Sequence, residues 1–103
     1  MALAREYIGL PVTPVLGQNY PNPFNASTAI RLVLPRTEEV EIAVYNLKGQ
    51  KVTVLADGVL EPGTYTLFWN GRDAEGRQLA SGVYPYRLQT GDRMETRKMV
   101  LLE

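Results

Sequence analysis

Apolar and polar residues alternate with a period of two along most of the chain from Thr28 onward. The alternation is clear in six segments, which cover 28–34, 40–45, 51–54, 65–69, 83–88 and 96–102. A period of two places successive side chains on opposite faces of a strand, and these segments are rich in β-branched and aromatic residues, which favour strands. The pattern therefore predicts short β-strands, with no convincing helix among them.

Turn residues separate the predicted strands. Residues 46–49 fit a short hairpin in which Gly49 takes a positive φ angle. Further glycine-containing turns fall at 70–71, 75–76, 81–82 and 91–92. Strands and turns at this spacing predict an all-β, Ig-like antiparallel β-sandwich of about seven short strands. Pro85 has no N–H to donate, so we expect its strand to lie at a sheet edge, or its nitrogen to face away from a ladder.

The first residues differ from the rest of the chain. Residues 1–17 mix prolines and glycines with small and apolar residues, and we interpret them as a linker from an upstream domain, with a short extended piece at its end. Residues 18–27 form a turn-rich entry in which Phe24 is the apolar anchor. The folded domain is therefore expected to cover 18–103.

Composition narrows the function. The 103 residues suit one domain, and 11 basic residues balance 11 acidic ones, which gives no electrostatic footprint for nucleic acid or an anionic membrane. No apolar run approaches the roughly 20 residues that span a bilayer. The first residues lack the pattern of a signal peptide, so an exported protein would carry its signal elsewhere. We therefore expect neither a nucleic-acid partner nor direct insertion into a membrane.

The chain contains no cysteine and no histidine. It therefore cannot build a disulfide, a thiolate nucleophile, a Ser-His-Asp triad or a histidine-bearing zinc site. We expect no enzyme activity, no catalytic residue, no metal and no cofactor.

Three residue groups suggest chemistry that the sequence supports poorly. Residues 71–76 resemble a calcium loop but lack the remaining ligands of an EF-hand, so we interpret them as a turn with solvated carboxylates. Glu39 and Glu41 share one strand face and are expected to face solvent. The third possibility is an aromatic sugar-binding platform formed by Tyr65, Trp69, Tyr84 and Tyr86. These residues lie on the same strand faces as Leu67 and Leu88, so we predict that they belong to the core.

Four segments, taken in order, resemble one known family. They are 18–25 (QNYPNPFN), 44–52 (VYNLKGQKV), 69–76 running into 80–84, and 97–102 (RKMVLL). This order is similar to the type A C-terminal sorting domain of the type IX secretion system and to the related Ig-like domain of the flagellar hook-capping protein. The resemblance covers about 16–103, with two departures: Ala26 stands where the family commonly has proline, and Pro85 replaces an apolar residue.

The resemblance implies a secretion and sorting signal. In such a system a cargo domain upstream in the same chain reaches the periplasm, an outer-membrane translocon recognises the C-terminal domain, and a sortase-like protease often cuts the linker. The protein would then be secreted or held at the cell surface. The recognition residues that the resemblance implies are Asn22, Pro23, Phe24, Gly49, Gly82, Tyr84, Lys98, Met99, Val100, Leu101 and Leu102. The alternative is an Ig-like accessory module for carbohydrate binding or domain spacing.

The last strand is the natural docking element under this interpretation, because a free strand edge can pair with a partner by β-augmentation. Within it, Val100 and Leu102 share one face and Met99 and Leu101 share the other, so we expect one of these pairs to be buried. Lys98 is expected to face solvent.

Overall fold

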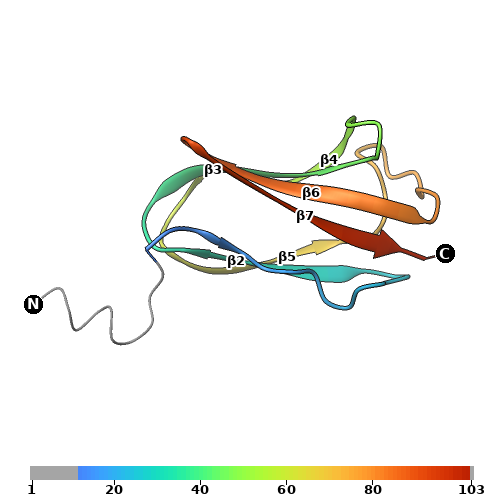
Figure 1. Ribbon diagram of the computed structural model, residues 1–103, viewed down its shortest axis with the longest axis horizontal. Coiled ribbons are helices and arrows are strands. Elements are labelled where there is room, and N and C mark those ends of the chain that lie inside the picture. The colour runs from blue at the N-terminus through green and yellow to red at the C-terminus, as the bar shows by residue number, and fades with distance from the viewer. Residues whose placement is uncertain (1–11, 103) are drawn as a thin grey trace, which may run out of the picture.

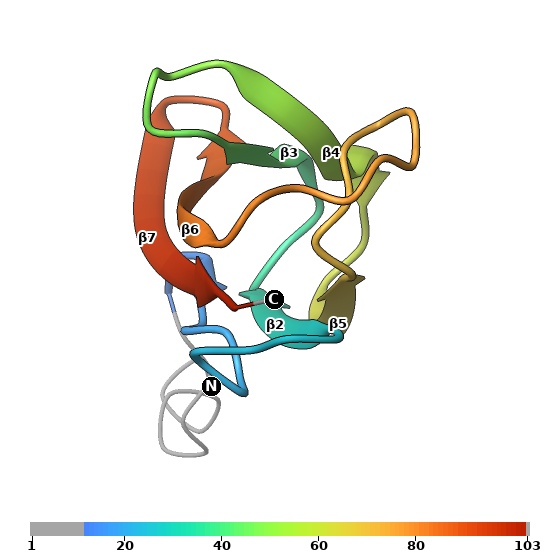
Figure 2. The same ribbon diagram turned by 90° about the vertical axis from the view of Figure 1, so that its right-hand side faces the viewer.

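The computed structural model describes residues 12–102, which fold into two antiparallel sheets packed face to face (Figure 1). This range forms seven strands, which are β1 (Val15–Leu16), β2 (Thr28–Leu34), β3 (Glu38–Tyr45), β4 (Lys51–Leu60), β5 (Gly63–Trp69), β6 (Gly82–Thr90) and β7 (Arg93–Leu101). One sheet has the order β1-β2-β5 and the other β4-β3-β6-β7. The end-on view shows the second of these orders, with β7 at the outside (Figure 2). The predicted all-β antiparallel sandwich is confirmed. Within residues 12–102 no helix is long and apolar enough to cross a membrane.

The three-stranded sheet follows the alternation of its sequence. β2 pairs with β5 from Thr28↔Trp69 to Leu34↔Gly63. Ile30, Leu32 and Leu34 are buried, whereas Arg31 between them is exposed. The regular register keeps one apolar face against the opposite sheet, because a strand without a bulge never changes the parity of its side chains.

The four-stranded sheet departs from strict alternation in β4. The register between β3 and β4 shifts twice, and each shift leaves one extra residue on β4, first Val52 and then Leu55. Both extra residues pack against the core, whereas Val54 is 42% exposed. The regular alternation predicted over 51–54 therefore does not hold, because a bulge changes the parity of the residues that follow it.

Trp69 lies in the centre of the core, as its parity predicted. It is 2% exposed, and its ring lies 5.6 Å from that of Phe24 and 5.4 Å from that of Tyr84, measured between centroids. Its indole N–H donates to the carbonyl of Arg72 at 2.9 Å, so the polar atom is satisfied inside the core. Tyr84 and Tyr86 are also buried, and these aromatic residues are core rather than a surface platform.

Pro85 lies in β6, which is an inner strand between β3 and β7, so the first of the two alternatives, an edge strand, is wrong, and the second, a nitrogen that faces away from a ladder, applies. The pairing of β6 with β3 runs from Thr90 back to Tyr86, which pairs with Val44, and it does not reach Pro85. On the β7 side, Val100 is paired with Val83, but its N–H and C=O bond to the strap, residues 17–24, so this is a non-hydrogen-bonded pair. Hydrogen-bonded and non-hydrogen-bonded pairs alternate along an antiparallel ladder, so Pro85↔Lys98, two residues away, is non-hydrogen-bonded as well. Pro85 therefore stands where neither neighbouring strand needs its missing N–H.

The N-terminal part of the sandwich begins earlier than the interpretation of 1–17 as a linker placed it. Val15 and Leu16 form β1 and pair with Val33 and Leu32 of β2. Leu16 is completely buried, and the N–H of Gly17 donates to the carbonyl of Arg31. Residues 15–17 therefore belong to the folded domain, whereas 1–11, most of the proposed linker, lie outside the described residues.

We expect Trp69→Ala to lower the free energy of unfolding by about 3–5 kcal/mol, because it opens a cavity between two aromatic rings. Phe68→Ala is the matched control, since Phe68 is the preceding residue of β5 and is 68% exposed; its effect should stay within about 0.5 kcal/mol. Urea unfolding followed by far-ultraviolet circular dichroism measures both changes. Equal losses in the two variants would contradict the assignment of Trp69 to the core.

Candidate functional site

The two ends of the domain meet at the edge of the four-stranded sheet. β7 is an edge strand of that sheet, and residues 17–24, here called the strap, run beside its C-terminal end (Figure 1, Figure 2). The N–H of Phe24 donates to the carbonyl of Val100 at 3.0 Å, and the N–H of Leu102 donates to the carbonyl of Phe24 at 2.8 Å. The strap thus adds a short parallel bridge, Phe24↔Leu101, to the outside of β7.

Polar side chains extend this contact along β7. The side-chain oxygen of Asn22 accepts the N–H of Val100 at 2.9 Å, and the Gln18 carboxamide donates to the carbonyl of Lys98 at 2.8 Å. The expectation that β7 offers a free edge is therefore wrong for 98–102. A partner that docks there must use the side chains or displace the strap.

The strap is also held from inside the sandwich by Tyr86. Its hydroxyl donates to the carbonyl of Gly17 at 2.7 Å and accepts the N–H of Asn19 at 2.9 Å. The buried Asn19 side chain donates to the hydroxyl of Thr28 at 3.0 Å and to the carbonyl of Pro21 at 3.1 Å. These bonds satisfy polar groups that would otherwise be costly to bury. Sequence reasoning placed Tyr86 in the core but gave no signal of this role.

The last strand alternates between buried and exposed side chains. Met99 and Leu101 are 0% and 1% exposed, so the expectation of one buried pair is confirmed. Lys98 is exposed as expected, Val100 is half-buried, and Leu102 is 48% exposed. A partner can therefore touch Lys98 and Leu102 directly, whereas Met99 and Leu101 act by holding β7 in place.

The remaining candidate recognition residues divide into two groups. Phe24 is buried against Trp69 and anchors the strap, as expected, while Asn22 and Pro23 beside it are exposed. Gly82 and Tyr84 pair with β7 at Leu101 and Met99, so they lie under the site and support it.

Gly49 is not part of this surface. It lies in the turn between β3 and β4, where its φ angle of 83° fits the predicted hairpin. β3 is separated from β7 by β6. The role of Gly49 is therefore to allow the turn.

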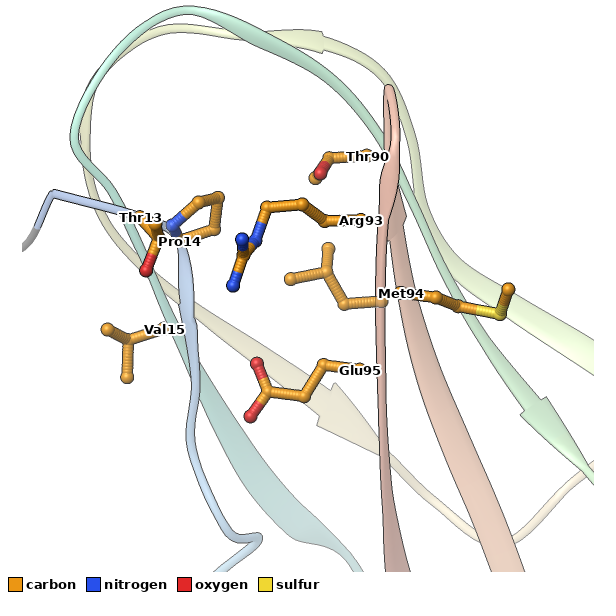
Figure 3. Close-up of a pocket in the computed structure, with 8 residues that line it drawn as sticks. Thr13, Pro14, Val15, Thr90, Arg93, Met94 and Glu95 are labelled. Atoms are coloured by element: carbon orange, nitrogen blue, oxygen red, sulfur yellow. The ribbon is translucent and has the colours of Figure 1, made fainter.

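The strap leaves the other half of the β7 edge uncovered. A cleft of about 300 Å³ opens there between residues 13–15 and the start of β7. The side chains of Arg93 and Glu95 reach into it toward Pro14 and Val15, whereas Met94 points away (Figure 3). The two charged groups have opposite signs, so this cleft has no net preference for a cation or an anion.

The turn that resembles a calcium loop is closed by its own residues. One oxygen of the Asp73 carboxylate accepts the N–H groups of Glu75 and Arg77, and the other accepts the Arg77 guanidinium at 3.0 Å. The backbone N–H of Arg77 is the main reason that the pKa of Asp73 lies below its ordinary value. Among residues 12–102 there is no group of three or more acidic, cysteine or histidine side chains that could hold a metal ion.

Comparisons with known proteins agree on the fold. The FlgD Ig-like domain family model matches residues 22–93. Dimeric latent PorU from Porphyromonas gingivalis aligns with 89% of this chain at a TM-score of 0.66 and 17% identity. PorZ of the same organism, described as an essential bacterial surface component of the type-IX secretion system, aligns with 97% at a TM-score of 0.56 and 19% identity. The chain spans 10% of PorU and 12% of PorZ. No curated protein sequence matches it.

We expect Tyr86→Phe to lower the free energy of unfolding by about 1–3 kcal/mol, because it leaves the Gly17 carbonyl and the Asn19 N–H without their partner while the ring stays packed. Tyr20→Phe is the control, since Tyr20 is 81% exposed and its hydroxyl is in water. Urea unfolding of both variants measures the difference. A Tyr86→Phe variant as stable as Tyr20→Phe would show that the hydroxyl does not hold the strap.

The same hydroxyl predicts a loss of stability at alkaline pH. Burial raises the pKa of Tyr86 above its ordinary value, more than the hydrogen bond from Asn19 lowers it. The folded state therefore keeps this proton where the unfolded chain loses it, so its contribution to stability is present below about pH 10 and declines as the pH rises through the folded-state pKa. Urea midpoints measured from neutral to alkaline pH should fall less steeply in Tyr86→Phe than in the natural chain; parallel declines would contradict this assignment.

Proposed function

This chain belongs to the FlgD Ig-like domain family, and from that premise we propose that it is a sorting domain, which directs an attached cargo across the outer membrane to the cell surface by the type IX secretion system. The observation that carries the proposal is the meeting of the strap with the end of β7. The segments 18–25 and 97–102 both contribute to the resemblance, and they lie far apart in the sequence. Together they form one exposed surface on a rigid support.

Sorting by such a surface requires a stable fold and no reaction at the domain itself. The exposed members available to a translocon are Asn22, Pro23, Lys98 and Leu102. Phe24, Met99 and Leu101 fix their positions from the core, which limits the entropy lost on binding. We propose that the domain is not an enzyme and that its partners are an outer-membrane translocon and a sortase-like protease. The similarity to PorZ, a surface component of that system, is consistent with this role.

A cleavable linker upstream of the domain is compatible with the position of the strap. The chain enters the sandwich at β1 and then runs through the strap to the edge of β7. A protease that cuts upstream of β1 would release the cargo and leave the recognition surface intact. Anchoring or release of the cargo would then take place at the cell surface, after passage through the periplasm.

Deleting 98–103 would not test this proposal cleanly, because it removes Met99 and Leu101 from the core. Lys98→Glu is sharper, since the Lys98 side chain is exposed and the strap contacts its backbone carbonyl only. We expect the melting temperature to stay close to the natural value, because exposed substitutions usually change stability within about 0.5 kcal/mol. Surface delivery of a fused cargo in a host that has the type IX system should fall about tenfold, the effect of losing roughly 1.4 kcal/mol of recognition.

The matched control is Arg93→Glu, which makes the same charge change at the uncovered end of β7. It should fold and deliver cargo normally. Protease accessibility on intact cells separates surface cargo from periplasmic cargo in both variants. Equal delivery by Lys98→Glu, Arg93→Glu and the natural domain would contradict a recognition role for the end of β7 and would favour a spacer.

A further inference from the structure

A row of three residues crosses the outer face of the three-stranded sheet. Tyr20 and Ala29 exchange both backbone hydrogen bonds, at 2.9 and 3.0 Å, and Ala29 pairs on its other side with Phe68. Residues directly opposite each other on neighbouring strands point to the same face of a sheet. Tyr20 and Phe68 are 81% and 68% exposed, so both rings stand on this face and are open to solvent. We call these three residues the outer aromatic row.

The spacing of this row suits a chain of sugar rings. Two strand separations of about 4.8 Å place Tyr20 and Phe68 about 10 Å apart, a span comparable to a disaccharide. Ala29 between them is small and half-buried, so it leaves a flat floor. Isolated exposed apolar residues need no explanation, but two exposed aromatic rings in one row of a sheet face offer an apolar area on which a ligand can stack.

The row ends at a cleft of about 340 Å³ that Phe68 helps to line. Three residues with uncharged polar side chains line this cleft: Ser27, Thr53 and Asn70. Within residues 12–102 neither hydroxyl makes a hydrogen bond in the structure, and of Asn70 only the oxygen is used, by the N–H of Arg72. An aromatic wall with a few unpaired hydroxyl and amide groups is typical of a small-ligand site.

The charges of the cleft indicate which ligand fits. Its two charged lining residues have opposite signs, and each is engaged within the 70–77 loop: Arg72 donates to the carbonyl of Gly76, and Asp73 is closed by Arg77. The cleft therefore gives no net attraction to an anion or a cation. A neutral polyhydroxyl ligand satisfies both the aromatic row and the unpaired polar groups.

We propose that the outer aromatic row and the cleft beside Phe68 bind a neutral oligosaccharide. The apolar faces of two sugar rings stack on Phe68 and Tyr20, and the hydroxyls of the ring in the cleft bond to Ser27, Thr53 and Asn70. This site differs from the aromatic platform considered from the sequence, whose members Trp69, Tyr84 and Tyr86 are buried. It goes beyond the proposed sorting role, because Ser27, Thr53, Phe68 and Asn70 belong neither to the strap nor to β7, and the site shares Tyr20 with the strap.

The test is nuclear magnetic resonance titration of the intact domain with cellohexaose, xylohexaose and chitohexaose. At least one should produce saturable shifts confined to Ser27, Thr53, Phe68, Asn70 and the residues around Tyr20. Phe68→Ala should weaken that binding about tenfold, the effect of losing one stacking contact, whereas Phe68→Tyr should retain it. Met94→Ala, which removes an apolar side chain that is 58% exposed on β7, is the control and should bind normally.

Ligand length tests the second ring. The natural domain should bind a hexasaccharide more tightly than the matching disaccharide, and Tyr20→Ala should abolish most of that gain while keeping the melting temperature. The proposal is overturned if none of the three hexasaccharides shifts these residues, if Phe68→Ala binds as well as the natural domain, or if only an acidic hexamer such as hexagalacturonic acid binds. Concentration-dependent broadening at Phe68 without any sugar shift would identify a protein contact instead.

Discussion

The pairing of the strap with the end of β7 is the constraint on which the rest of the structure depends. An edge strand exposes unpaired N–H and C=O groups, and native proteins cover or disrupt such edges. Here Phe24, Asn22 and Gln18 contact the backbone of β7 over 98–102. These contacts tie the beginning of the domain to its last strand, so the strap cannot leave β7 without exposing backbone polar groups.

This pairing also organises the core. Phe24 can pack against Trp69, which in turn contacts Tyr84, because the strap crosses from the three-stranded sheet to the edge of the other sheet. Below it, the hydroxyl of Tyr86 reaches through the sandwich to the strap backbone. The aromatic residues therefore have two roles. Their rings fill the space between the sheets, and the polar atoms of Trp69 and Tyr86 bond to the backbone of the 70–77 loop and of the strap.

The two proposed surfaces depend on which residues are buried and which are exposed. Buried residues of the strap and of β7 hold exposed neighbours in a fixed arrangement, which suits recognition of a folded domain by a partner. The outer face of the three-stranded sheet carries residues of the opposite parity on β2 and β5, and it meets the strap at Tyr20. A single small sandwich can thus carry two proposed surfaces that share Tyr20, since each strand has two faces and each sheet has two edges.

The sequence by itself determined six of the strands, the hairpin at Gly49, the burial of Trp69 and the alternation that buries Met99 and Leu101, because each of these follows from local periodicity or turn chemistry. It predicted no strand at β1 and only the first residues of β4. Only the tertiary structure decided which sheet edge the strap covers, why β6 tolerates the missing N–H of Pro85, and that Tyr20 lies in one row with Phe68. The bulges that turn Val54 outward belong to the same group. These features arise from pairing between segments as far apart as Asn22 and Val100, and the register of such pairs is set by the packing of the whole sandwich.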